Sequence, residues 1–191
     1  MGDLLFVIGP PAVGKMTVAE AIAARTGFRV FHNHLAIEPV LRFFEFGTPA
    51  FSRLVQGFRD AVFEEVAASE LPGLIFTYVW AFDLPGDAES VRRYAEPFAR
   101  RGARVLYLEL EAAQEERLRR NVGESRLAEK PSKRDLDRSR ELLLRADRDH
   151  RLNSDGEFTD NPAHVRVDST HLTPAEVAAL AIDRFGLTGE S

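Results

Sequence analysis

Hydrophobic residues along the chain form short continuous runs separated by longer stretches with helical periodicity. Each run is rich in Val, Ile, Leu, Phe or Tyr and is bounded by Gly, Pro or charged residues, a pattern typical of β-strands. The runs cover residues 4–8, 29–32, 74–80, 104–110 and 164–168. Because the first, third and fourth runs are hydrophobic almost throughout, we expect strands that are covered on both faces, as in a parallel sheet.

The stretches between these runs carry helix signals. An apolar stripe at helical spacing extends from Phe51 to Val66. The segment Thr173-Pro174-Ala175-Glu176 has the pattern of a capping box with proline at the first helical position, and Gly186 is suited to end that helix. Further signals are the candidate caps Ser132 and Asp135 after Pro131, and two favourable pairs one helical turn apart, Glu115/Arg119 and Glu116/Arg120. Alternating strands and helices predict one α/β domain over residues 1–191, with a five-stranded parallel sheet, helices on both faces and a binding crevice at the carboxyl ends of the strands.

Composition narrows the class of protein. With 191 residues, 45% hydrophobic and 29% charged, the chain has the balance of one globular domain and not that of a disordered one. It has no cysteine, which excludes disulfides and thiolate metal sites and is compatible with the reducing cytoplasm, where we expect the protein. The N-terminal apolar run is too short for a signal peptide, and no run reaches the ~20 residues of a membrane helix, so we expect no membrane association.

The charge of the chain is negative overall but unevenly distributed. A net charge of −5 argues against nucleic-acid binding, which usually needs a basic face. Between Arg117 and Arg151, however, twelve Lys and Arg residues face seven Asp and Glu residues. This local excess of five positive charges suits the binding of an anionic phosphate group.

The strongest chemical signal is Gly9-x4-Gly14-Lys15, placed directly after a buried strand and before a helical stretch, Lys15–Arg25. Glycine lets the backbone curl around a phosphate, the amides and the helix N-terminus attract negative charge, and Lys15 would neutralise the β- and γ-phosphates. This P-loop pattern predicts nucleotide contacts from Gly9, Ala12, Val13, Gly14, Lys15, Met16 and Thr17. The alternative is a glycine-rich turn with a surface lysine.

One position of the loop departs from the P-loop pattern. The residue after the lysine should be Ser or Thr, whose hydroxyl binds Mg²⁺, but here it is Met16, which cannot bind a hard cation. We expect the hydroxyl of Thr17 to meet the α-phosphate. Mg²⁺ would then be held by water and nucleotide phosphates, or by a carboxylate elsewhere, and the sequence does not identify the metal ligands.

Together these features resemble the small-molecule kinase branch of P-loop proteins, which includes shikimate, gluconate and adenylate kinases and antibiotic phosphotransferases, and also the tunicamycin-resistance protein. The resemblance covers the loop, a second strand ending near residues 32–34, the arginine-rich segment 117–126 and Asp168-Ser169-Thr170 before the last helix. It implies the three-layer P-loop NTPase fold, a substrate flap at about 34–70 and a lid at about 120–135. It also implies that Arg120 lies near the adenine, that Arg126 belongs to the lid and that Asp168 meets the base edge.

Movable arginines over the γ-phosphate are what phosphoryl transfer needs, because the reaction depends on positioning and charge neutralisation. A solvated helix face with ion pairs would explain many of the same charges.

On the acceptor side the chain departs from shikimate kinases. Where those carry two aspartates, this chain has Phe31-His32-Asn33-His34. Either His32 or His34 could accept the proton of a substrate hydroxyl near neutral pH, or each could only bind substrate or cap the next helix. Asp83 is the best candidate carboxylate for a metal-bound water or a substrate hydroxyl, and Trp80 could stack on a ligand or pack in the core.

The predicted flap is rich in phenylalanine. The rings are those of Phe43, Phe44, Phe46, Phe51, Phe58 and Phe63. We expect most of them to lie in the core, although such an apolar flap also hints at a substrate with a hydrophobic portion. Arg53 and Arg59 could bind an anionic group, although the solvent-exposed face of the helix is the favoured place for both.

The leading interpretation is an ATP-dependent phosphotransferase that uses Mg²⁺ and acts on a hydroxyl of a small molecule. Met16 favours one alternative, a nucleotide-binding sensor without transfer activity. The other alternative is an NTP hydrolase stimulated by a protein partner. Neither the substrate nor the oligomeric state follows from the sequence.

Overall fold

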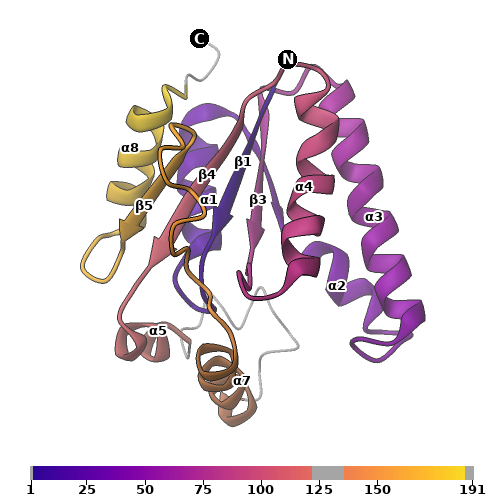
Figure 1. Cartoon of the computed structure of the whole chain (residues 1–191), viewed down its shortest axis with the longest axis vertical. Helices are drawn as coiled ribbons and strands as arrows, with labels where there is room; N and C mark the ends of the chain where they lie inside the picture. Colours follow the sequence, from indigo (N-terminus) through magenta and orange to yellow (C-terminus); the bar gives the residue numbers. More distant parts are fainter. Residues whose placement is uncertain (1, 122–135, 188–191) are drawn as a thin grey trace.

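A computed structural model describes residues 2–121 and 136–187 and contains a five-stranded, all-parallel sheet (Figure 1). The strand order is β2-β3-β1-β4-β5. The strands are β1 (Asp3–Ile8), β2 (Arg29–His32), β3 (Gly73–Tyr78), β4 (Val105–Glu111) and β5 (His164–Asp168). The α/β fold with a parallel sheet is therefore confirmed, and each strand lies within two residues of its predicted range.

Helices cover both faces of the sheet and complete the three layers (Figure 1). The described helices are α1 (Lys15–Thr26), α2 (His34–Val40), α3 (Pro49–Ala68), α4 (Pro85–Ala99), α5 (Gln114–Asn121), α7 (Leu136–Asp149) and α8 (Pro174–Phe185). Alternate side chains of β1 explain the layering, because successive residues of a strand point to opposite faces. Leu5 and Val7 pack with α1 and α8, whereas Leu4 and Phe6 pack with α3 and α4. All four are fully buried.

The predicted capping box at the last helix is present. Thr173 accepts a hydrogen bond from the Glu176 amide at 3.3 Å, and the Glu176 carboxylate accepts one from the Thr173 amide at 2.7 Å. Gly186 ends α8 in the left-handed conformation, with φ of 58°. The candidate caps Ser132 and Asp135 lie outside the described residues.

Of the two predicted ion pairs on α5, one is confirmed and one is wrong. Arg120 pairs with Glu116 at 2.6 Å, one turn away as expected. Arg119 pairs with Glu116 at 2.7 Å instead of with Glu115. A helix brings residues three and four apart equally within reach, and Glu116 therefore accepts from both arginines.

The carboxyl ends of the strands all lie at the lower edge of the sheet in Figure 1, because the strands are parallel. Helices α5 and α7 lie below this edge on the side of β4, and α2 lies on the side of β3 and β2. Among the described residues, no helix combines the length and the hydrophobicity needed to cross a membrane. The glycine-rich loop lies at this edge of the sheet, between the end of β1 and the start of α1.

Candidate functional site

The glycine-rich loop joins β1 to α1 by a tight turn with several left-handed residues. The φ angles are 136° at Gly9, 61° at Ala12 and 105° at Gly14. A side chain at Gly9 would also lie 2.3 Å from the carbonyl oxygen of Leu110 in β4, so both conformation and space require glycine there. The loop ends at the N-terminus of the twelve-residue helix α1. This turn followed by a helix N-terminus is the backbone arrangement that binds phosphate.

Lys15 holds its ammonium group across the loop. Its Nζ donates to the carbonyl oxygens of Gly9 and Pro10, both at 2.7 Å. An anionic phosphate seated on the loop would compete with these two neutral carbonyls for the ammonium charge. The predicted phosphate contact of Lys15 is therefore within reach of the side chain and remains a prediction.

The residues that follow do not provide a built Mg²⁺ site. Met16 is half-buried and offers only a thioether, while Thr17 is exposed. Across residues 2–121 and 136–187 no three His, Cys, Asp or Glu side chains are grouped so as to hold a metal. The described residues therefore do not fit a Mg²⁺ ion held by three or more of these side chains.

Arg120 connects the phosphate loop to the turn that follows β5. Its guanidinium donates to the Val13 carbonyl at 3.0 Å and to the Ser169 carbonyl at 2.7 Å. Its Nε donates to Glu116, and hydrogen bonds from Arg119 and then Arg120 hold the pKa of this carboxyl at about 2. Arg120 therefore joins the phosphate loop to the turn after β5, and its expected place near the adenine remains a prediction.

Asp168 folds back onto its own turn. Its carboxylate accepts from the Thr170 hydroxyl at 2.6 Å and from the Thr170 amide at 2.9 Å, and these bonds lower its pKa. The Thr170 hydroxyl in turn accepts from the Ala113 amide at 2.9 Å. Asp168 thus shapes the exposed turn beside Arg120, and the proposed contact with the base edge remains a prediction.

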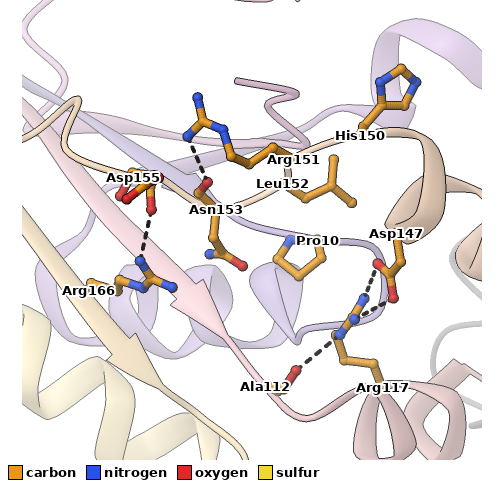
Figure 2. A pocket seen from close by; sticks show the side chains of 11 residues that line it. Pro10, Ala112, Arg117, Asp147, His150, Arg151, Leu152, Asn153, Asp155 and Arg166 are labelled. Atoms are coloured by element: carbon orange, nitrogen blue, oxygen red, sulfur yellow. Dashed lines mark hydrogen bonds and ion pairs between the residues drawn. The ribbon is translucent and has the colours of Figure 1, made fainter. Parts of the chain in front are cut away.

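A polar pocket of about 500 Å³ opens beside Pro10, between the end of β4 and the segment that follows α7 (Figure 2). Arg117 lies at its edge, buried, and donates to both carboxylate oxygens of Asp147 at 2.9 and 2.6 Å. Arg117 Nη1 also approaches the Pro11 carbonyl at 3.5 Å, which connects the phosphate loop to α5 and α7. The sequence placed Arg117 in a basic segment but gave no signal for this buried pair.

The other arginines of this pocket also have partners. Arg151 donates to the Asn153 carbonyl at 3.3 Å and pairs with Glu157. Arg166 donates to the Ser154 carbonyl at 3.0 Å and pairs with Glu111 at 2.5 Å. Arg117 and Arg151, both from the basic segment 117–151, are therefore ion-paired within the fold.

The carboxyl ends of β2 and β3 bring the predicted acceptor residues to one place. His32 ends β2 and His34 begins α2, with its Nδ1 3.3 Å from Glu38 Oε1. Between them, the Asn33 amide lies 3.4 Å from the Thr77 hydroxyl of β3. His32 and His34 therefore flank the adjoining ends of two parallel strands, and their roles toward a hydroxyl remain predictions.

The placement of Arg59 corrects the sequence analysis. Arg59 does not lie on the solvent-exposed face of α3: it is half-buried, with its guanidinium 6.0 Å from the centre of the Phe76 ring. It donates to the Asn33 side chain and, at 3.4 Å, to the Tyr94 hydroxyl. The side-chain oxygen of Asn33, directly after β2, accepts a hydrogen bond from this cation, a contact that helical periodicity alone does not reveal.

Asp83 lies in the loop after β3 and joins it to the residues after α7. Its carboxylate lies 3.0 Å from His150 Nδ1 and accepts from the Arg151 amide at 2.9 Å. The hydrogen bond with His150, followed by that from Arg151, lowers the pKa of Asp83. His150, which sequence reasoning missed, thus fixes this carboxylate; a role of Asp83 toward metal-bound water or substrate remains a prediction.

Two further predictions concern Arg126 and Trp80. Arg126 and lid residues 122–135 lie outside the described residues. Trp80 stacks on Phe82 with ring centres 4.5 Å apart and contacts Phe158 edge-on at 5.8 Å. The packing alternative is therefore the one observed for this tryptophan.

The phenylalanine-rich flap differs from the expectation that most of its rings are core. Phe51 and Phe63 are buried, but the other four are exposed to the following extents: Phe43 77%, Phe46 73%, Phe58 49% and Phe44 41%. For Phe43, Phe44 and Phe46 the reason is the short helix α2, which ends at Val40 and leaves residues 41–48 outside a helix, whereas Phe58 lies on an exposed side of α3.

No protein-family model and no curated protein sequence matches the chain. Its fold, however, matches solved structures along almost the whole length. The Deinococcus radiodurans tunicamycin resistance protein is 19% identical, with a TM-score of 0.56 and 100% of both chains covered. The Mycobacterium tuberculosis APS kinase, solved with AMPPNP and APS, is 15% identical with a TM-score of 0.58, covering 97% of this chain and 98% of that one. The Acinetobacter baumannii shikimate kinase, solved with shikimate, is 18% identical with a TM-score of 0.55, covering 97% and 93%.

The chain has the P-loop kinase fold. This confirms the fold predicted from the loop and from the order of strands and helices. At these identities the likeness concerns the fold alone.

Proposed function

We propose that this protein is an ATP-dependent phosphotransferase that acts on a hydroxyl group of a small molecule. The observation that carries the proposal is the position of the Lys15 ammonium, held at 2.7 Å by two carbonyls of a glycine-rich loop that ends at a helix N-terminus. Structures of the same fold support it, since one is named as a kinase and was solved with the nucleotide analogue AMPPNP.

In the proposed reaction, the acceptor hydroxyl oxygen bonds to the γ-phosphorus while the bond from that phosphorus to the β–γ bridging oxygen breaks, so that ADP leaves. The proton of the hydroxyl passes to His32 or His34, which begin and end the short connection between β2 and α2. Lys15 and the loop amides neutralise the charge on the phosphates. The Arg120 brace keeps the loop and the turn after β5 in fixed positions.

When bound with the nucleotide, Mg²⁺ would neutralise part of the charge on the phosphates. Since Met16 offers no hard ligand, we expect wild-type protein to need a high Mg²⁺ concentration. Met16→Ser should lower the half-saturating Mg²⁺ concentration, by about fivefold, because a hydroxyl oxygen replaces a thioether at this position. The measurement is a Mg²⁺ titration of ADP release at saturating ATP, with Met16→Ala as the matched control. An equal shift in both variants would mean that side-chain size and not the hydroxyl matters.

The experiment that tests the function is ADP release from Mg-ATP across pooled small molecules with hydroxyl groups, including metabolites, nucleosides and antibiotics. The proposal expects one pool to stimulate ADP release in wild type, and division of that pool identifies the acceptor. Mass spectrometry should then find a product heavier by one phosphate. ATP binding without stimulation by any pool would instead favour a nucleotide sensor, the function that Met16 suggests.

A further inference from the structure

The exposed hydrophobic side chains of this protein are concentrated in one segment. Among the described residues, ten large hydrophobic side chains are exposed, and six of them lie between residues 35 and 58: Leu35, Phe43, Phe44, Phe46, Leu54 and Phe58. These six residues are called the apolar flap below. Large exposed apolar patches on soluble domains usually mark a binding surface.

Three residues of the flap, Phe46, Leu54 and Phe58, mark a row that leads toward the end of β2. At its outer end, the Phe46 ring lies 5.0 Å from that of Phe51, at the start of α3. Leu54 and Phe58 follow on the same face of α3, four residues apart. At the inner end, the Phe58 ring meets Phe31 of β2 edge-on at 6.0 Å.

Polar groups lie near the inner end of this row, where Phe58 contacts Phe31. Phe58 directly precedes Arg59, whose guanidinium donates to the side chain of Asn33, the residue that follows β2. The apolar row and the polar strand ends therefore lie next to each other, at the side of the sheet where α2 and α3 are seen in Figure 1. A ligand that fits both has a polar, hydroxyl-bearing head and an apolar body.

Charge on the flap favours a neutral apolar body. Residues 35–58 contain two acidic residues, Glu38 and Glu45, and two basic residues, Arg42 and Arg53. The segment thus has no net charge, whereas binding to an anionic lipid surface or to a polyanion would favour a cluster of Lys and Arg.

We propose that the apolar flap binds the hydrophobic portion of the acceptor, so that this protein acts on amphipathic alcohols with an aliphatic or aromatic body. This inference rests on the proposed function for the phosphate that is transferred, but the binding of an apolar body does not depend on transfer. Each buried phenyl ring would contribute through the removal of its apolar surface from water.

The first test measures apolar binding without ATP. The neutral fluorescent probe N-phenyl-1-naphthylamine is titrated into wild type and into the double variant Phe43→Ser/Phe46→Ser, and is displaced with n-octyl β-D-glucoside below its micelle concentration. We expect saturable binding to wild type, displacement by the octyl but not by the methyl glucoside, and binding roughly tenfold weaker in the double variant. Leu180→Ser is the matched control, because Leu180 is 51% exposed on α8, which packs on the other face of the sheet.

Several results would overturn the inference. Equal probe binding in wild type and the double variant would place the probe elsewhere. Light scattering could show that wild type is a dimer and the double variant a monomer. The flap would then be covered by a second copy of the chain. If wild type sedimented with phosphatidylcholine vesicles and the double variant did not, the flap would bind a lipid surface. Circular dichroism melting of the double variant checks that its fold is intact, as expected for exposed positions.

The second test separates this inference from the proposed function. ADP release is compared for pairs of alcohols that share a head group and differ only in an alkyl or aryl body. A preference for the larger member in wild type, lost in the double variant, supports both proposals. If wild type turned over the larger and the smaller member of each pair equally well, and the double variant did the same, the apolar flap would be refuted and the kinase would stand. Flap-dependent probe binding without any turnover would support the apolar flap and refute the kinase.

Discussion

Replacement of Glu109 by glutamine is expected to lower the free energy of unfolding by about 2–3 kcal/mol at pH 7. Glu109 lies in β4 with 0% of its surface exposed. Its carboxylate accepts from the Ser154 hydroxyl at 2.6 Å and from the Ser154 amide and Asn153 side chain at 2.8 Å. His164 Nε2 of β5 lies 2.8 Å away. In the variant, the glutamine NH₂ would face donors that need an acceptor, and part of this buried network would be left unsatisfied.

The pH dependence of this effect follows from the pKa of Glu109. Burial raises the pKa, but the hydrogen bonds from His164, Ser154 and Asn153 outweigh burial and lower it from 4.5 to about 2. Because the folded state binds the proton more weakly than the unfolded chain, the carboxylate stabilises the fold above pH 4.5, and this contribution is lost as the pH falls toward 2. The difference in stability between wild type and Glu109→Gln should therefore shrink in urea denaturation experiments as the pH is lowered from 7 to 3.

Glu157→Gln is the matched control. The pKa of Glu157 is also lowered to about 2, chiefly by the hydrogen bond from Arg151, but this carboxylate lies at the surface with 33% of its side chain exposed. Solvent screens such a pair, and the substitution should cost no more than about 1 kcal/mol. Equal losses in the two variants would contradict the burial argument, and a pH-independent loss in Glu109→Gln would contradict the role of its charge.

The network around Glu109 shows where prediction from the sequence stops. The strands and the phosphate loop follow from neighbouring residues: the run from Leu4 to Ile8, and then glycines at fixed spacing before Lys15. The partners of Glu109, by contrast, lie 44 to 55 residues further along the chain. One signal was visible, since an acidic residue interrupts the apolar run 104–110, and a buried carboxylate needs donors.

The acceptor side shows the same limit. The hydrophobic run 29–32 predicted the end of β2 at His32, as observed, because that position depends only on where a strand ends. The bond of Asp83 with His150 joins residues 67 apart, and no local pattern contains it. Helical periodicity likewise described α3 but not the turn of residues 41–48, whose rings remain outside the core because α2 is short.

Lys15→Ala is expected to reduce kcat/KM for acceptor phosphorylation by about 100-fold or more. The Lys15 ammonium lies 2.7 Å from the carbonyl oxygens of Gly9 and Pro10, at the mouth of the loop, and the proposed reaction needs this charge on the β- and γ-phosphates. Charge develops on the leaving oxygen during transfer, so the loss should affect kcat more than ATP binding. The measurement is steady-state ADP release with the acceptor found by the pooled screen, together with ATP binding by calorimetry.

Arg25→Ala is the matched control for Lys15→Ala. Arg25 is an exposed basic residue in the last turn of the same helix, α1, so its removal changes the net charge equally but at the opposite end of the helix. Its kcat/KM should stay within about twofold of wild type, because solvent screens an exposed charge at that distance. Lys15→Arg should recover little activity, since the planar guanidinium does not replace a compact ammonium in a tight loop. If Lys15→Ala kept half of the wild-type rate, the loop would not be the site of transfer, and the proposed function would fail at its central residue.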